Sequence, residues 1–215
     1  MRDITFISDT HGSHYDCSKW LGGGFMICHC GDVSSMGHRK EIQGFLKWFG
    51  SLPYEHKIFI AGNHDFGLQN YGIKAFAVPE GVTYLENSFV ELGGIKIYGS
   101  PVIPAFMNWA FMRERGEDIR RVWDCIHDCD VLLTHGPPKG ILDFVNNSWT
   151  RTNVGCEELR RRILDFNPWI HAFGHIHDCY GKVSTDSTVF INCSVMNEDY
   201  DVVNAPVIID YDKVI

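Results

Sequence analysis

The stretch Ile58-Phe59-Ile60-Ala61-Gly62-Asn63-His64-Asp65 decides how the rest of the chain is interpreted. Its first four residues form a short apolar run rich in β-branched and aromatic side chains, which is typical of a strand covered on both faces. Gly62 permits a sharp turn, and three polar residues follow at once. In a polar site, His64 would donate a proton and Asp65 would orient its imidazole, with Asn63 as a neutral oxygen ligand. Taken alone, the same residues are equally consistent with an ordinary loop, because Gly-Asn and His-Asp are common in turns.

The same arrangement, a buried strand followed by polar side chains, recurs four times elsewhere in the chain. The predicted strands and the polar residues after them are 2–8 with Asp9 and His11, 25–30 with Asp32, 130–134 with His135, and 169–173 with His175 and His177. Residues two apart on an extended chain point to the same side, so the paired residues of the first and last groups converge. One such strand end is unremarkable. Here five strand ends carry nitrogen and oxygen donors, and none carries a cysteine. Such a set of donors suits two divalent ions that share a carboxylate.

Helical periodicity separates several of these strands. The apolar residues of the clearest helix recur at three- and four-residue spacing: Ile42, Phe45, Leu46 and Phe49. The predicted helices span 35–49, 71–77, 118–129 and 155–166. An alternation of strands and helices predicts a parallel sheet covered by helices, with sites beyond the carboxyl ends of the strands. We therefore expect an α/β fold in a single domain over residues 1–215.

Short strands without helices between them make up most of the remaining chain. They are expected at 82–85, 89–92, 95–98, 180–183, 188–193 and 206–211. Gly93-Gly94 is typical of a hairpin turn, and residues 101–115 are expected to form a loop with at most one helical turn. Because no helix intervenes between the last three strands, we expect them to be antiparallel and to form a second sheet packed on the first.

Composition narrows the class of protein. The chain has 215 residues, which suits one domain with a substantial core. Acidic residues outnumber basic ones by 27 to 19, which argues against a protein that coats long nucleic acid. We expect no signal peptide and no membrane span, because no apolar run approaches about 18 residues. The eight cysteines include no C-x-x-C pair, so we expect reduced thiols, no structural zinc site and a cytoplasmic location.

The five polar groups form a set with a recognisable order along the chain. Written as motifs, they are Asp9-x-His11, Gly31-Asp32, Gly62-Asn63-His64-Asp65, His135-Gly136 and Gly174-His175-x-His177. This set resembles the calcineurin-like metallophosphoesterase superfamily. Further segments are similar to its metallophosphoesterase-domain-containing subgroup, namely 52–57, 96–101, 132–138, 173–177 and 190–194. Some members of that subgroup have glycine in place of the first histidine of the last motif. Since this chain has His175, the resemblance implies a complete second metal site.

The resemblance implies a four-layer αββα sandwich of two mixed β-sheets flanked by helices, with a dinuclear metal centre. The first metal would be held by Asp9, His11, Asp32 and His177. The second metal would be held by Asp32, Asn63, His135 and His175, so Asp32 would bridge the two ions. We expect manganese, with iron or zinc as alternatives, because ligand type alone does not choose among them.

The activity that the resemblance implies is hydrolysis of small phosphodiesters, with 2′,3′- or 3′,5′-cyclic nucleotides as candidate substrates. A hydroxide between the two ions would attack phosphorus in line. His64, if protonated, would donate to the leaving oxygen while Asp65 holds its imidazole. The site should be open, because the chain has no insertion large enough for a cap domain. A phosphomonoesterase and a non-catalytic protein-interaction scaffold fit the same fold, although the intact ligand set argues against the scaffold. A nuclease acting on long DNA is disfavoured by the acidic charge.

Two other features of the sequence have two interpretations each. His14 follows the first motif by three residues, and either faces the substrate or lies in an exposed loop. The aromatic residues Phe106, Trp109 and Phe111 either wall off a substrate or pack in the core.

Overall fold

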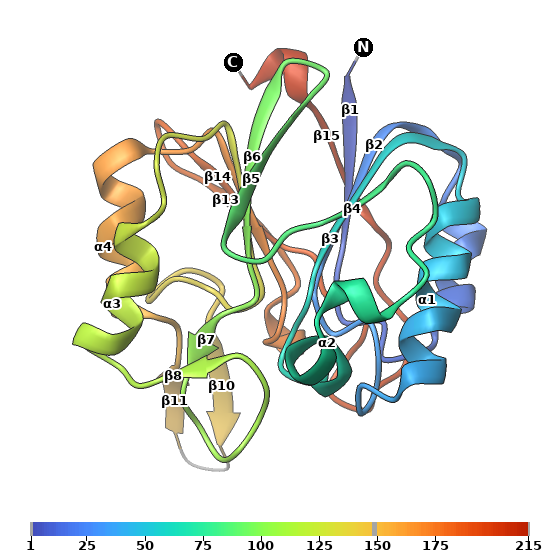
Figure 1. Ribbon diagram of the computed structural model, residues 1–215. Coiled ribbons are helices and arrows are strands. Elements are labelled where there is room, and N and C mark those ends of the chain that lie inside the picture. The colour runs from blue at the N-terminus through green and yellow to red at the C-terminus, as the bar shows by residue number, and fades with distance from the viewer. Residues whose placement is uncertain (1, 148–149, 215) are drawn as a thin grey trace.

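Two mixed β-sheets lie face to face in the computed structural model, which describes residues 2–147 and 150–214 (Figure 1). The first sheet has the strand order β15-β1-β2-β3-β4. Its strands are β1 (Asp3–Ile7), β2 (Gly24–Cys30), β3 (Tyr54–Ile60), β4 (Val82–Tyr84) and β15 (Val207–Asp210). β1 to β4 run parallel, and β15 pairs antiparallel with β1. The carboxyl ends of β1, β2 and β3 therefore lie at one edge of the sheet.

The second sheet has the strand order β13-β14-β12-β9-β6-β5. Its strands are β5 (Ser88–Leu92), β6 (Ile95–Ser100), β9 (Val131–Thr134), β12 (Ile170–Phe173), β13 (Gly181–Ser184) and β14 (Val189–Asn192). The four inner strands run parallel, while β5 and β13 at the two edges are antiparallel to their neighbours. β9 and β12, which precede His135 and His175, thus end at the same edge.

The prediction of a separate antiparallel sheet for the tail is wrong, because its three strands divide between the two sheets. β13 and β14 extend the second sheet, and β15 extends the first. β13 supplies the return segment that a helix usually provides, so β14 can lie parallel to β12. Alternate residues of β14 are buried on opposite faces, Phe190 toward the outer helices and Ile191 between the sheets. Burial on both faces suits an interior position in a larger sheet.

Helices cover the outer faces of both sheets and give the molecule four layers. α1 (Arg39–Ser51) covers the first sheet, while α3 (Glu117–Asp124) and α4 (Glu157–Phe166) pack together on the second (Figure 1). Alternation along β1 divides its side chains between the layers, since Phe6 faces the second sheet and Ile7 faces α1. The predicted αββα sandwich of two mixed sheets is confirmed.

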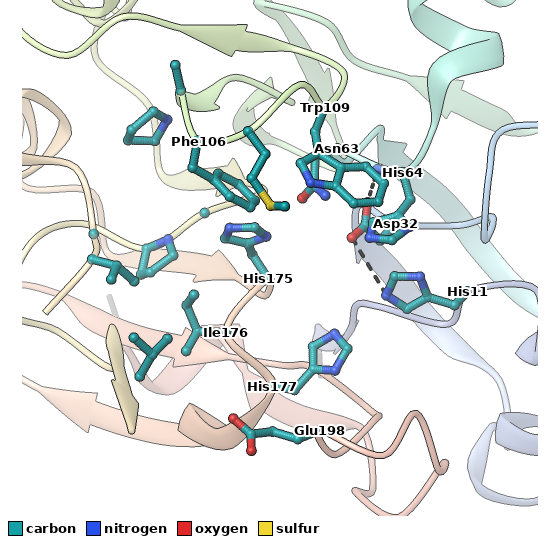
Figure 2. Close-up of a pocket in the computed structure, with 18 of the residues that line it drawn as sticks. His11, Asp32, Asn63, His64, Phe106, Trp109, His175, Ile176, His177 and Glu198 are labelled. Atoms are coloured by element: carbon teal, nitrogen blue, oxygen red, sulfur yellow. Dashed lines mark hydrogen bonds and ion pairs between the residues drawn. The ribbon is translucent and has the colours of Figure 1, made fainter. Parts of the chain in front are cut away.

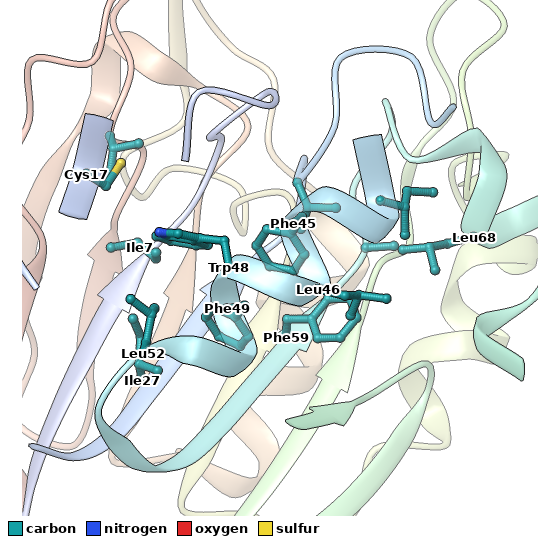
Figure 3. Close-up of a cluster of buried hydrophobic side chains, with 14 of the residues drawn as sticks. Ile7, Cys17, Ile27, Phe45, Leu46, Trp48, Phe49, Leu52, Phe59 and Leu68 are labelled. Atoms are coloured by element: carbon teal, nitrogen blue, oxygen red, sulfur yellow. The ribbon is translucent and has the colours of Figure 1, made fainter. Parts of the chain in front are cut away.

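The apolar face predicted for α1 is buried against the first sheet. Its Phe45 stacks on Phe49 with ring centroids 5.1 Å apart (Figure 3). The helix begins at Arg39, four residues later than predicted. Glu41 accounts for this difference, because its carboxylate holds the preceding segment in a non-helical turn. It accepts backbone N–H bonds from Ser35, Met36 and His38.

Two other helices differ from prediction in their bounds. The helix expected over 71–77 is instead α2 (Phe66–Tyr71) followed by a 3-10 turn, η2 (Ile73–Ala75). Gly72 separates the two, with a φ of 68° that ends the α-helix. The helix α3 ends at Asp124, so residues 125–129 lie outside it. The other 3-10 segments are η1 (His14–Trp20), η3 (His177–Cys179) and η4 (Tyr211–Lys213).

Two small paired elements are found where the sequence indicates only loop. β7 (Ile103–Pro104) pairs with β8 (Met112–Arg113) inside the segment 101–115. β10 (Phe144–Asn147) and β11 (Thr150–Asn153) form a hairpin. The hairpin predicted at Gly93-Gly94 is confirmed, since β5 and β6 pair antiparallel on either side of it.

No helix within residues 2–147 and 150–214 combines the length and apolar character needed to cross a bilayer. No two cysteines form a disulfide in the part of the chain that the structure describes; Cys125 is exposed and the other seven are buried.

Candidate metal centre

The polar residues that follow the five strands meet at one edge of the two sheets. Figure 2 shows those that line the pocket, namely His11, Asp32, Asn63, His64, His175 and His177. Hydrogen bonds between backbone groups join the loops that carry them. The Asp9 N–H donates to the Gly31 carbonyl at 3.0 Å, and the Gly174 N–H donates to the His135 carbonyl at 2.9 Å. The structure therefore brings together all seven side chains that the sequence analysis names as metal ligands.

The carboxylate of Asp32 lies at the centre of this cluster, and the residue is only 2% exposed. Its Oδ2 is 3.2 Å from Nε2 of His135 and 3.6 Å from Nε2 of His11. Its Oδ1 accepts the backbone N–H of His64 at 2.8 Å. One carboxylate oxygen thus faces imidazoles that come from different sheets, as a bridging ligand would.

The other side chains complete two groups around Asp32. Asp9 Oδ1 is 3.5 Å from His177 Nε2, and Asn63 Oδ1 is 2.9 Å from His135 Nε2. Three sets of side chains have potential ligand atoms within 4.8 Å of one another: Asp9, His11 and His177; His11, Asp32 and His64; and Asp32, His135 and His175. The first and third sets contain members of the two predicted metal sites, and the second adds His64.

The buried imidazole of His11 is an observation that favours a cation at this site. Both of its ring nitrogens lack a hydrogen-bond partner among the described residues. Burying a polar group without a partner is costly, and a divalent ion at one ring nitrogen would remove that cost. The surrounding donors are nitrogen and oxygen atoms, which suit manganese, iron or zinc. The residues present therefore fit a metal.

Backbone carbonyl groups orient two of the imidazoles from behind. Nδ1 of His135 lies 2.9 Å from the Cys30 carbonyl oxygen, and Nδ1 of His177 lies 2.9 Å from that of Asn197. A carbonyl oxygen only accepts, so each Nδ1 carries the proton and each Nε2 is free to face the cluster. This second hydrogen bond fixes the ring and makes Nε2 a better ligand.

Four of the seven residues have a left-handed backbone that amino acids other than glycine rarely adopt. They are Asp9 (φ 56°), His11 (φ 41°), Asp32 (φ 55°) and His175 (φ 70°). Each such conformation costs on the order of 1–3 kcal/mol and persists only where the surroundings enforce it. Concentration of this strain at one cluster is typical of a functional site.

Three of the seven proposed ligands, His175, Asn63 and Asp32, follow a glycine at which there is no room for a side chain. A Cβ at Gly174 would collide with Oδ2 of Asp9, and a Cβ at Gly62 would collide with Oδ1 of Asp32. At Gly31, a Cβ would lie 2.6 Å from Nδ1 of His135. These positions need glycine because the backbone approaches a ligand side chain closely.

Charges within the cluster shift the pKa values of its members in opposite directions. Burial alone would raise the pKa values of Asp9 and Asp32, but the facing imidazoles hold both well below their usual range. Burial alone would lower the pKa values of His135 and His177, but the same two carboxylates raise both to about 9. Burial lowers the pKa of His175 to about 3, so this imidazole is neutral and available as a ligand.

The role predicted for Asp65 is wrong, because its carboxylate does not orient His64. It accepts hydrogen bonds from backbone N–H groups in the loops after β2 and β3, namely those of Val33, Ser34 and Gly62. The imidazole of His64 is instead held at Nδ1 by the carbonyl oxygen of Ser35, at 2.7 Å. Burial raises the pKa of Asp65 to about 6. Asp65 is thus a structural group that joins two loops.

A pocket of about 860 Å³ opens over the cluster (Figure 2). Phe106 and Trp109 line it, whereas Phe111 is buried in the hydrophobic cluster that also contains the apolar residues of α1. Of the two interpretations of these aromatic residues, a wall of the site therefore holds for Phe106 and Trp109, and core packing holds for Phe111. Neither interpretation of His14 holds, because its side chain is buried against Trp48, with ring centroids 4.9 Å apart, and does not line the pocket.

Two pocket residues lie next to the cluster; the sequence analysis names Trp109 as a candidate wall of the site but does not identify Tyr200. The ring of Trp109 lies 4.3 Å from that of His64, and the ring of Tyr200 lies 4.9 Å from that of His11. Tyr200 has a φ of 63° and belongs to the turn that contains the Asn197 carbonyl. Turn residues are visible at 197–201, but their spacing does not connect them with strand ends almost 200 residues earlier.

Known proteins match this chain in sequence and in fold. The sequence model of the calcineurin-like phosphoesterase family matches residues 2–179. Metallophosphoesterase domain-containing protein 1 of Homo sapiens is 37% identical, over 95% of this chain and 69% of that protein. UPF0046 protein T07D4.2 of Caenorhabditis elegans is 36% identical, over 95% of this chain and 58% of its own length. The crystal structure of Phosphopantetheinyl Hydrolase (PptH) from Mycobacterium tuberculosis has the same fold, with a TM-score of 0.59, 14% identity and coverage of 92% and 90% of the two chains.

The substitution Gly174→Ala is expected to reduce metal content, because the added methyl group would displace the carboxylate of Asp9. Metal per chain, measured by plasma mass spectrometry after gel filtration, should fall by at least one equivalent. The matched control is Gly44→Ala in α1, where a Cβ meets nothing within 4 Å. It should keep all bound metal and melt at the same or a higher temperature. A fully loaded Gly174→Ala protein would refute this account of the glycine.

Metal affinity is expected to rise with pH between 6 and 9. Without metal, His135 and His177 have pKa values of about 9 and carry a proton that an ion must displace. Each proton released should increase affinity by up to roughly tenfold per pH unit below that pKa. Titration calorimetry in two buffers with different ionisation heats measures the number of protons released. Affinity that is independent of pH, with no proton release at pH 7.5, would contradict the prediction.

Proposed function

This chain belongs to the calcineurin-like phosphoesterase family, and we propose that it is a metal-dependent hydrolase of small phosphodiesters. Membership in the family implies a hydrolase that acts on phosphate esters. The observation that carries the narrower proposal is the cluster around Asp32, in which carboxylate, amide and imidazole donors from five strand ends face one pocket.

In the proposed centre, one ion would be held by Asp9, His11, Asp32 and His177. The other would be held by Asp32, Asn63, His135 and His175. When bound, the two ions neutralise the anionic substrate and activate water for attack on phosphorus. Manganese is the proposed metal, with iron and zinc as alternatives.

His64 is the proposed proton donor. Its Nδ1 donates to the Ser35 carbonyl, so the second ring nitrogen remains available to protonate the leaving oxygen. The ring of Trp109 packs against the imidazole and limits its motion. The backbone N–H of the same residue is fixed on Asp32, which places the donor next to the proposed metals.

The shape and charge of the pocket favour diesters over monoesters. A monoester dianion would need further cationic groups, but Arg115 is the one arginine or lysine among the described residues that line the pocket. Its guanidinium is engaged by the carbonyls of Val154 and Gly155 and by the carboxylate of Glu157. A diester carries one charge and a second organic group, for which a pocket of about 860 Å³ has room. Cyclic nucleotides are candidate substrates of this kind.

Steady-state assays with bis(p-nitrophenyl) phosphate and p-nitrophenyl phosphate test the proposal. The manganese-loaded protein is expected to hydrolyse the diester with a kcat/KM at least about tenfold higher. Both cyclic nucleotide isomers belong in the same panel, with metal-free protein as the control. A strong preference for the monoester would favour a phosphomonoesterase. Absence of metal-dependent hydrolysis across the panel, with tight binding of a partner by metal-free protein, would favour the scaffold.

His64→Ala is expected to slow turnover by about 10²–10⁴-fold because it removes the proton donor. Its metal content should not change, since His64 is not a proposed metal ligand. Asp32→Ala is the matched contrast and should lose at least one ion. Metal analysis and turnover are measured on the same preparations. If His64→Ala lost both ions, or if Asp32→Ala kept both, the roles assigned here would be wrong.

A further inference from the structure

One part of the pocket, which we call the apolar lobe, lies beyond His175 on the side away from His11 and Asp32. Figure 2 shows Phe106 and Ile176 on that side of His175, and Asp32 and His11 on the opposite side. The lobe consists of Pro104, Phe106, Pro137, Val145, Val154 and Ile176. Each of these residues has an apolar side chain.

Separate segments of the chain build the lobe. Phe106 comes from the loop between β7 and β8, and Val145 lies on β10. The β10 strand is held to the turn after Ile176 by the thiol of Cys179, which donates to the Phe144 carbonyl at 3.2 Å. This hydrogen bond fixes the β10 wall of the lobe relative to the segment that carries the proposed ligands His175 and His177.

The polar groups at the border of the lobe are already used within the protein. The Arg115 guanidinium donates to the Val154 carbonyl at 2.6 Å and to the Gly155 carbonyl at 2.9 Å, and pairs with Glu157 at 2.5 Å. The Val154 N–H donates to the Asp143 carbonyl at 2.9 Å. A sugar or nucleobase in the lobe would therefore lose hydrogen bonds to water and gain few from this wall.

The lobe is continuous with the position of the reacting phosphate. The ring of Phe106 lies 5.4 Å from that of His175, a proposed ligand of the second ion. Ile176 is placed between His175 and His177 in the chain and lines the same pocket. A group attached to phosphate through one ester oxygen would thus enter the lobe directly.

We infer that the substrate is a phosphodiester with one apolar ester group, aryl or alkyl, which occupies the apolar lobe. This inference rests on the proposed phosphodiesterase function and narrows its substrate class, because it favours diesters with an apolar ester group over the cyclic nucleotides considered above. The lobe selects the diester by burying that group, because apolar surface removed from water contributes in proportion to its area. Diesters with a nucleoside in this position are expected to be poorer substrates.

The kinetic test keeps the leaving group constant and varies the other ester group. The manganese-loaded protein is assayed with three diesters that share p-nitrophenol as the leaving group. They are the p-nitrophenyl esters of methyl phosphate, of phenyl phosphate and of thymidine 5′-phosphate. We expect kcat/KM for the phenyl compound to exceed that for the methyl compound by roughly tenfold or more, mainly through KM. The thymidine compound should fall below the phenyl compound. Equal values for methyl and phenyl, or a preference for thymidine, would overturn the inference.

Two variants change the lobe without changing the proposed metal ligands. Phe106→Ala removes a ring that is 41% exposed, and Val145→Thr adds a hydroxyl group at nearly constant shape. Both should reduce the preference for phenyl over methyl to about twofold or less. The matched control is Tyr71→Ala, which removes an exposed ring outside the pocket and should keep the preference. A preference that both lobe variants retain would overturn the inference.

A binding measurement separates the inference from the proposed function. Diphenylphosphinate and dimethylphosphinate have the same anionic group, and neither can be hydrolysed at a P–O–C bond. Titration calorimetry with the metal-loaded protein should show tighter binding of the diphenyl compound, and Phe106→Ala should abolish the difference. If no diester is hydrolysed but this difference is found, the proposed function fails and the lobe assignment stands. If diesters are hydrolysed and the two phosphinates bind equally, the lobe assignment fails alone.

Discussion

The buried carboxylate of Asp65 is the constraint on which the geometry of the cluster depends. It accepts hydrogen bonds from Val33 and Ser34, which follow Asp32, and from Gly62, which precedes Asn63. The loop after β2, which has a left-handed backbone at Asp32, and the loop after β3 are thereby fixed to one group. Hydrogen bonds to a buried carboxylate stabilise its charged form against the opposing effect of burial. The bridging carboxylate and the amide ligand therefore have positions set from behind, independent of any ion.

The composition of the site follows from the sequence more directly than the roles of its members. Carboxyl ends of parallel strands meet at a common edge, so polar residues directly after buried strands can be assigned to one cluster from the order of residues alone. Orientation cannot be inferred in the same way. Asp65 lies next to His64 in the chain, yet it accepts hydrogen bonds from Val33 and Ser34, about 30 residues earlier, and from Gly62. The contact to His64 expected of Asp65 is made by Ser35 instead. Adjacency in sequence does not determine which donor a side chain reaches.

A similar limit applies to the fold. Periodicity identifies the main strands and helices, whereas the sandwich of two mixed sheets is expected from the resemblance to the family. The tail shows where this reasoning fails, because a strand can serve as the return segment of a parallel connection and β13 does so. The pocket wall is a second example of this failure. Phe106 and Phe111 are five residues apart and equally apolar. One borders the pocket and the other is buried, a difference set by the β7–β8 pairing that spacing does not reveal.

The pairing of β15 with β1 has a practical consequence for the use of this domain. Arg2 and Asp212 form an ion pair at 2.6 Å, so the two ends of the described chain leave the protein side by side. They do so at the amino end of β1, whereas the pocket lies beyond its carboxyl end (Figure 1). A tether, affinity tag or fused protein at either end would therefore emerge on the far side of the molecule. Attached to a bead or a surface through one terminus, the domain would present its pocket mouth to free solution.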